Sequence, residues 1–254
     1  MRLSPKLAAR ALFALGLTLS AASAPDSAAW DTVLKKYVLD NGAVRYAPLK
    51  QDSAALERFV SQVGEVSPHS HPELFPSRDA KLAYWINAYN ALVISSFTKD
   101  YPEKRDRLQS AWGKINFFFR LKFRVGGQMR TLDDIEKNTI RKEFGDSRIH
   151  FAIVCASASC PWLSRDAYTE ANLNDLLDRE TRRYMGQARN VNPDKARKEL
   201  TVSEIFKWFR EDFGKSEQDV IRFIAKYRVD GPDFANSGWK LKYYPYNWTL
   251  NESH

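Results

Sequence analysis

Cysteine is scarce in this sequence, with two residues among 254, at positions 155 and 160. The spacing is not that of a Cys-x-x-Cys redox motif, which argues against a thioredoxin-type function. A glycine-rich phosphate loop and a His-Glu-x-x-His metal helix are also missing, so neither nucleotide binding nor zinc-protease chemistry is indicated. After the first thirty residues no apolar run is long enough to cross a bilayer. We therefore expect no cofactor, no metal and no transmembrane segment in the mature chain.

The N-terminus has the pattern of a secretory signal peptide. Three basic residues precede the apolar run 11–19, and the small residues 20–24 follow. This order predicts a signal peptide over 1–22, cleaved near Ala22, although an N-terminal core helix is the alternative. A lipobox cysteine is missing, so we expect a soluble periplasmic or secreted product.

The rest of the chain is rich in core-forming residues, with 7 Trp, 11 Tyr and 15 Phe in the sequence. The formal charge of +8 falls to +5 without residues 1–22, which carry three bases and no acid. An exported protein meets envelope lipids and polysaccharides before nucleic acid, so we set nucleic-acid binding aside. Repeats and linkers are lacking. We predict one α+β domain over 23–254, helix-rich and built around a small mixed or antiparallel sheet.

The spacing of apolar residues predicts a helix most strongly over 79–97, where these residues cover more than one face. Asn87 and Asn90 fall within it, and a buried amide without partners costs about 1–3 kcal/mol. We therefore expect Asn87 to be buried and hydrogen-bonded.

Alternating residues predict a half-buried strand over 117–125, followed by a hairpin turn at Gly126-Gly127 and a second strand through Met129. A compact apolar run predicts a buried strand over 149–154. Thr131 with Asp134, and Ser216 with Asp219, form helix-capping patterns. Further helices are expected at 32–39, 54–63, 169–185, 205–213 and 220–227, and an extended segment at 241–250.

The two cysteines allow two interpretations. In an exported chain, Cys155 and Cys160 most simply form a local disulfide. Alternatively, Cys155 is a nucleophile at the end of a strand, and the small residues around Ser157 bring backbone N–H groups close to a developing oxyanion.

His150 is the obvious base for such a nucleophile, but five residues of regular strand span about 17 Å and would place the two side chains on opposite faces. A satisfied buried histidine is the alternative. Glu136 lies between apolar neighbours on its helix and is the natural partner of His150, unless it reaches solvent. Together with the two cysteines, His69 and His71 would make the four ligands of a zinc site. Their spacing, however, is not that of a zinc motif.

Several motifs together resemble the DUF547 family of uncharacterised domains, over roughly 79–250. They are Tyr84-Trp85-Ile86-Asn87-Ala88-Tyr89-Asn90-Ala91-Leu92, Val125-Gly126-Gly127, Leu132-Asp133-Asp134-Ile135-Glu136, Ile149-His150-Phe151-Ala152, Cys155, Ser159-Cys160-Pro161 and Tyr244-Pro245-Tyr246-Asn247-Trp248. The sequence departs from the family's frequent residues at Lys137, Val154 and Asn247. The resemblance implies a shared fold, and its Cys, His and Glu positions invite comparison with papain-like thiol chemistry.

Our leading hypothesis is a thiol-dependent hydrolase or acyltransferase acting on peptide or amide bonds, with an envelope peptide or protein as substrate. Its catalytic residues are Cys155, His150 and Glu136. The supporting or substrate-binding residues are Asn87, Asn90, Tyr89, Ser157 and Cys160. The alternative is a non-catalytic binding or scaffold module held by a Cys155–Cys160 disulfide.

Overall fold

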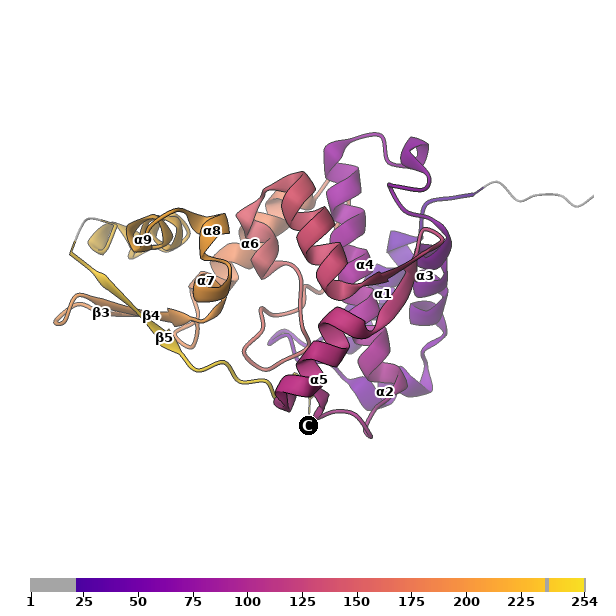
Figure 1. Cartoon of the computed structure of the whole chain (residues 1–254), viewed down its shortest axis with the longest axis horizontal. Helices are drawn as coiled ribbons and strands as arrows, with labels where there is room; N and C mark the ends of the chain where they lie inside the picture. Colours follow the sequence, from indigo (N-terminus) through magenta and orange to yellow (C-terminus); the bar gives the residue numbers. More distant parts are fainter. Residues whose placement is uncertain (1–21, 236–237, 254) are drawn as a thin grey trace, which may run out of the picture.

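The structure is a computed structural model that describes residues 22–235 and 238–253. Except for Ala22, the predicted signal peptide lies outside this range. Figure 1 shows a helical lobe made by the first half of the chain and a smaller lobe, which holds β3 to β5 and α7 to α9, at the opposite end. Helix α6 lies between them. Within the described ranges, no helix combines the length and hydropathy needed to cross a membrane.

The helical lobe contains five α-helices, four further helical segments and one hairpin. The α-helices are α1 (Ser27–Tyr37), α2 (Tyr46–Gln51), α3 (Ala54–Glu65), α4 (Arg78–Lys99) and α5 (Ala111–Ile115). The other helical segments are η1 (Pro72–Leu74), η2 (Arg107–Gln109), η3 (Asn116–Arg120) and η4 (Asp134–Phe144). The hairpin pairs β1 (Lys122–Val125) with β2 (Gln128–Thr131) in antiparallel register.

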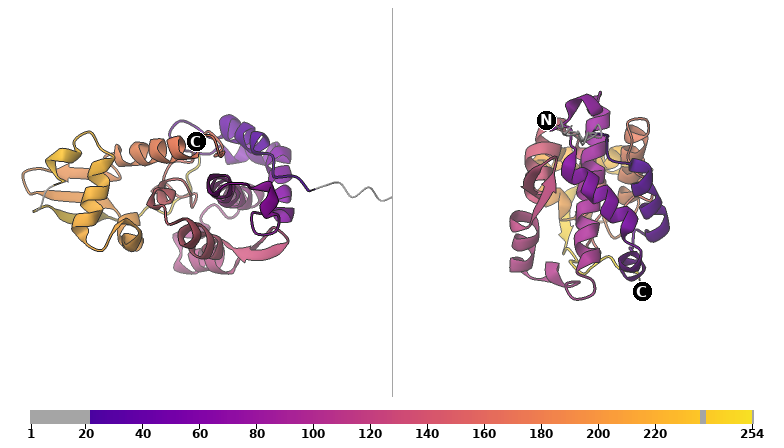
Figure 2. Two further views of the ribbon diagram at one scale, coloured as in Figure 1. Left: turned by 90° about the horizontal axis from the view of Figure 1, so that it is seen from above. Right: turned by 90° about the vertical axis from the view of Figure 1, so that its right-hand side faces the viewer.

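The second half of the chain contains η5 (Ser147–Phe151), α6 (Leu173–Met185), α7 (Ile205–Trp208), α8 (Arg210–Phe213), α9 (Glu217–Lys226) and η6 (Gly231–Asp233). Its sheet is mixed. Strand β4 (Glu199–Ser203) pairs antiparallel with β3 (Val191–Asp194) and parallel with β5 (Lys240–Tyr244). The predicted α+β class is confirmed, but the strands form two small sheets in separate parts of the fold instead of one central sheet (Figure 2).

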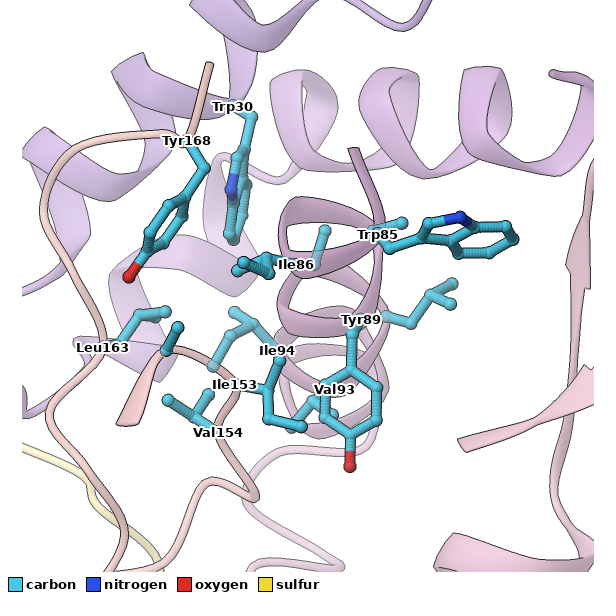
Figure 3. Close-up of a cluster of buried hydrophobic side chains, with 14 of the residues drawn as sticks. Trp30, Trp85, Ile86, Tyr89, Val93, Ile94, Ile153, Val154, Leu163 and Tyr168 are labelled. Carbon is cyan, nitrogen blue, oxygen red and sulfur yellow. The ribbon is translucent and has the colours of Figure 1, made fainter. Parts of the chain in front are cut away.

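Helix α4 is the central element of the larger core and matches the predicted helix. Its side chains are buried almost all round. Figure 3 shows Ile86, Val93 and Ile94 of α4 in a cluster with Ile153 and Val154, which precede Cys155. The core of the helical lobe therefore directly supports the loop 155–161, which holds both cysteines and is called the cysteine loop below.

Two predicted strands are wrong. Residues 116–120 continue α5 as a π-helical turn, so Phe117 packs 5.2 Å from the ring of Phe97 while Phe119 is 57% exposed. Only the last four residues of the predicted first strand are extended. Residues 147–151 form a 3₁₀-helix, and 152–154 follow it without strand pairing. Both segments are apolar enough for a strand, but each forms a helical turn that buries one phenylalanine ring, Phe117 in the first and Phe151 in the second.

Several local predictions are confirmed. Gly126 and Gly127 have φ values of +55° and +81°, as the hairpin turn requires. Thr131 Oγ1 accepts from the Asp134 N–H, and Ser216 and Asp219 form a capping box at the start of α9. The predicted helix over 205–213 is interrupted at Phe209, which separates α7 from α8.

Candidate active site

A cleft of about 240 Å³ lies where the two lobes meet and is mostly apolar. Its walls come from α4, η3, η4, η5, the cysteine loop, α7 and the C-terminal segment. The lining residues are Tyr89, Phe118, Phe119, Asp133, Glu136, Lys137, Arg141, His150, Ile153, Val154, Cys155, Cys160, Pro161, Ile205, Trp208, Phe209, Tyr246 and Trp248. The three residues predicted as catalytic, Cys155, His150 and Glu136, thus line one cavity.

Three groups surround the sulfur of Cys155. Its Sγ lies 3.0 Å from Ser157 Oγ, 3.1 Å from Cys160 Sγ and 3.4 Å from the Tyr246 hydroxyl. Both cysteines are free thiols, since a disulfide requires an S–S distance of about 2.05 Å. The structure therefore presents position 155 as a thiol within reach of hydrogen-bond donors.

The backbone turns sharply after Cys155. Ala156 has φ = +62°, a left-handed conformation that is uncommon for a residue with a Cβ atom. This turn directs the Ser157 N–H toward the Cys155 sulfur and brings the Ser157 hydroxyl to it as well. Successive right- and left-handed backbone conformations make such anion-binding concavities. The predicted role of the small residues as oxyanion donors stays a prediction, because the Ala158 and Ser159 N–H groups bond to carbonyl oxygens of the C-terminal segment.

The C-terminal segment holds the cysteine loop in place. The Ala158 N–H donates to Thr249 O at 2.7 Å, and the Ser159 N–H donates to Asn247 O at 3.1 Å. Asn247 N–H returns a bond to Ser159 Oγ at 2.9 Å. This pairing carries Tyr246 to the sulfur from 91 residues away.

The two thiols have opposite electrostatic environments. Burial raises the pKa of Cys155, but hydrogen bonds from Cys160, Ser157 and Tyr246 outweigh it and hold that pKa below its usual range. Burial and the neighbouring Cys155 raise the pKa of Cys160. Of the two thiols, Cys155 is therefore the one whose ionised form is favoured, whereas Cys160 favours its protonated form.

Glu136 is the second titratable group of the cleft. Burial raises its pKa to about 7, against the lowering effects of Arg141 and of the Tyr89 hydroxyl, which donates to Oε2 at 3.3 Å. The negative charges of Asp133 and Cys155 raise it further. A carboxyl group with this pKa exchanges a proton at neutral pH, as a general acid or base must.

His150 is paired with Asp212 and not with Glu136 as the sequence predicted. Its Nε2 lies 2.6 Å from Asp212 Oδ2, and its ring stacks on Phe209 at 4.1 Å between centroids. Burial lowers the pKa of His150 despite the opposing effect of Asp212. The 3₁₀-turn of η5, absent from the strand prediction, points this ring at α8. His150 still lines the same cleft as Cys155.

The two buried asparagines of α4 clamp different loops. Asn87 is 3% exposed; its Nδ2 donates to Tyr168 O and its Oδ1 accepts from the Tyr168 N–H, which confirms the prediction for this residue. Asn90 makes the same pair of bonds to Ala152 O and Val154 N–H, at 2.9 Å each. Asn90 thus fixes the backbone just before Cys155, while Asn87 supports a loop whose residues do not line the cleft.

The histidines considered as zinc ligands lie elsewhere. His69 Nε2 is 2.9 Å from Glu143 Oε1, and His71 Nδ1 is 2.9 Å from Ser70 Oγ. Within residues 22–235 and 238–253, no three His, Cys, Asp or Glu side chains are grouped as metal ligands.

Sequence reasoning missed Asp212 and the roles of Tyr246 and Trp248. Asp212 lies in a short helix among other charged residues, and no local pattern distinguishes it. Tyr246 and Trp248 belong to an aromatic segment that we had interpreted as an extended strand. This segment has more aromatic side chains than one strand face can bury. That excess was the sequence signal for a role outside the core.

The family model described as protein of unknown function, DUF547, matches residues 74–185. This segment runs from η1 to the end of α6 and includes Tyr89, Glu136, His150 and both cysteines. Asp212 and the C-terminal aromatic segment lie outside it. No curated protein and no solved structure matches the chain.

Proposed function

We propose that the protein is a thiol-dependent hydrolase or acyltransferase acting on peptide or amide bonds. The proposal rests on the chemistry of the cleft, since the family model that matches residues 74–185 describes a protein of unknown function. The observation that carries this proposal is the environment of Cys155. A thiol surrounded by three donors, in an apolar cleft that also holds a carboxyl group of pKa about 7, suits nucleophilic catalysis.

In the proposed reaction the Cys155 thiolate attacks the carbonyl carbon of the substrate, and the electron pair of the C=O bond moves to its oxygen. Collapse of this intermediate breaks the C–N bond and leaves an acyl thioester on Cys155. The leaving amine takes its proton from Glu136. Water, or a second amine, then attacks the thioester, gives a proton to the Glu136 carboxylate and restores the thiolate.

Other cleft residues have supporting roles in this scheme. Ser157 and Tyr246 donate to the sulfur and stabilise its negative charge before attack. Tyr89 orients the carboxyl group of Glu136. His150, held by Asp212, is a second proton-transfer group that lines the cleft. We further propose that the protein is exported and meets its peptide or protein substrate in the cell envelope, as its N-terminal sequence suggests.

The test is turnover of a panel of N-acyl peptide aminocoumarin amides and p-nitrophenyl esters, with intact-protein mass spectrometry to detect the acyl-enzyme. We expect wild-type turnover and a covalent acyl adduct, both lost in Cys155→Ser. Cys160→Ser serves as the matched variant, because its hydroxyl still donates to Cys155 and activity is retained. A wild-type protein that binds panel members without turnover or adduct would favour the binding-module alternative.

A further inference from the structure

Exposed apolar side chains are concentrated near the mouth of the cleft. Within the described residues six large apolar side chains are exposed: Trp112, Ile115, Phe119, Met129, Trp208 and Val229. Phe119 and Trp208 line the cleft itself. Trp112 and Ile115 precede Phe119 by seven and four residues on the continuous α5–η3 helical segment, so the three share one side of it.

The two rims of the cleft are joined by further ring contacts. Trp208 stacks on Trp248 at 5.6 Å between centroids. Lys114 Nζ lies 4.3 Å from the centre of the Trp248 ring, which brings α5 against the C-terminal segment. Trp112, Ile115, Phe119, Trp208 and Trp248 therefore form one apolar, mostly aromatic surface around the cleft entrance, which we call the rim.

Cations accompany the rim. The Arg120 guanidinium lies 4.4 Å from the Trp112 ring, and Lys114 covers Trp248. The exposed residues Lys207 and Arg210 flank Trp208 in sequence. The formal net charge is +8 for the whole sequence and +5 without residues 1–22. Tryptophan rings beside lysine and arginine are typical of surfaces that lie at the headgroup level of a membrane.

We propose that the rim docks the protein on an anionic phospholipid bilayer, with the cleft opening toward the lipid surface. The rings would enter the headgroup region, and the cations would pair with lipid phosphates. A protein partner fits the composition less well, because protein interfaces are depleted in lysine at their core. This inference is independent of the proposed catalysis, since a docked binding module would use the same surface.

The test is flotation of the full chain with phosphatidylcholine vesicles that contain, or lack, phosphatidylglycerol. We expect binding only to the anionic vesicles, weakened by high salt. Trp112→Ser/Ile115→Ser, which changes no cleft-lining residue, should lower the affinity about tenfold or more. Lys114→Glu and Arg120→Glu should each lower it about fivefold or more.

Val229→Ser is the control, because it removes a still more exposed apolar side chain from the other lobe. All variants retain residues 1–22, so differences among them report on the rim alone. Equal binding by the double variant and wild type, equal binding to neutral vesicles, or an equal loss in Val229→Ser would overturn the proposal. A double variant that loses self-association in sedimentation but keeps vesicle binding would assign the rim to a second copy of the chain instead.

Discussion

The Asp212 carboxylate bridges His150 and Arg141: its Oδ2 lies 2.6 Å from His150 Nε2 and 2.6 Å from Arg141 Nε. Although burial alone would raise the pKa of Asp212, its bonds to His150 and Arg141 hold that pKa well below the usual range. Asp212 is therefore ionised at neutral pH. It fixes the imidazole ring through Nε2.

Replacing Asp212 by Asn should destabilise the protein at pH 7 by about 1–2 kcal/mol, because charge-assisted bonds to two partners become weaker. Since the folded pKa of Asp212 is depressed, its contribution is present above the unfolded pKa and is lost as pH falls below about 4. Urea unfolding at pH 7 and pH 3.5 measures both effects. The exposed Asp52→Asn serves as a control and should cost less than Asp212→Asn, because an exposed ion pair is screened by solvent. A difference that does not shrink in acid would contradict the assignment.

Glu136 should make the wild-type protein less stable as pH rises through about 7. Its folded pKa lies above the unfolded value, so its favourable contribution is complete below about 4.3 and is lost as the buried carboxyl group ionises. Glu136→Gln keeps a neutral side chain, and we expect it to remove about 2–3 kcal/mol of this pH dependence. Urea unfolding of both proteins at pH 5 and pH 8 tests the expectation. Parallel pH profiles for the two proteins would count against the raised pKa.

Asn90→Ala and Asn87→Ala form a matched pair. Each leaves a buried backbone N–H and C=O without their amide partner, so each should lower the free energy of unfolding by about 2–4 kcal/mol. Only Asn90 supports the residues next to Cys155, so only Asn90→Ala should also change the alkylation rate of that thiol. Chemical denaturation and iodoacetamide kinetics give the two readouts. An equal kinetic effect of both variants would show that the asparagines act through general stability alone.

The parts of the fold that sequence predicted best are those determined by local chemistry. Helix α4 follows from a long apolar pattern, the hairpin turn from Gly126-Gly127, and the start of α9 from the Ser216–Asp219 box. The burial of Asn87 followed from its apolar neighbours. In each case the residues nearby in sequence are enough to determine the local structure.

The predictions that failed depend on distant partners. Phe117 and Phe119 alternate like strand residues, but Phe97 provides a pocket for the first while the second remains at the rim of the cleft. The run before Cys155 does not pair as a strand, because its first part is a 3₁₀-helix and Asn90 takes the backbone bonds of Ala152 and Val154 that follow it. The partner of His150 lies 62 residues away in sequence, and local patterns cannot specify such a contact.

The alkylation rate of Cys155 as a function of pH tests the central claim most directly. Iodoacetamide labelling of the native protein, followed by peptide mass spectrometry, reports each thiol separately. Because the pKa of Cys155 is held below its usual range, we expect its rate to rise through a midpoint below about 8.5, with Cys160 unlabelled. Tyr246→Phe removes one donor and should move the midpoint upward. Preferential labelling of Cys160, or two thiols protected as a disulfide, would contradict a nucleophilic Cys155.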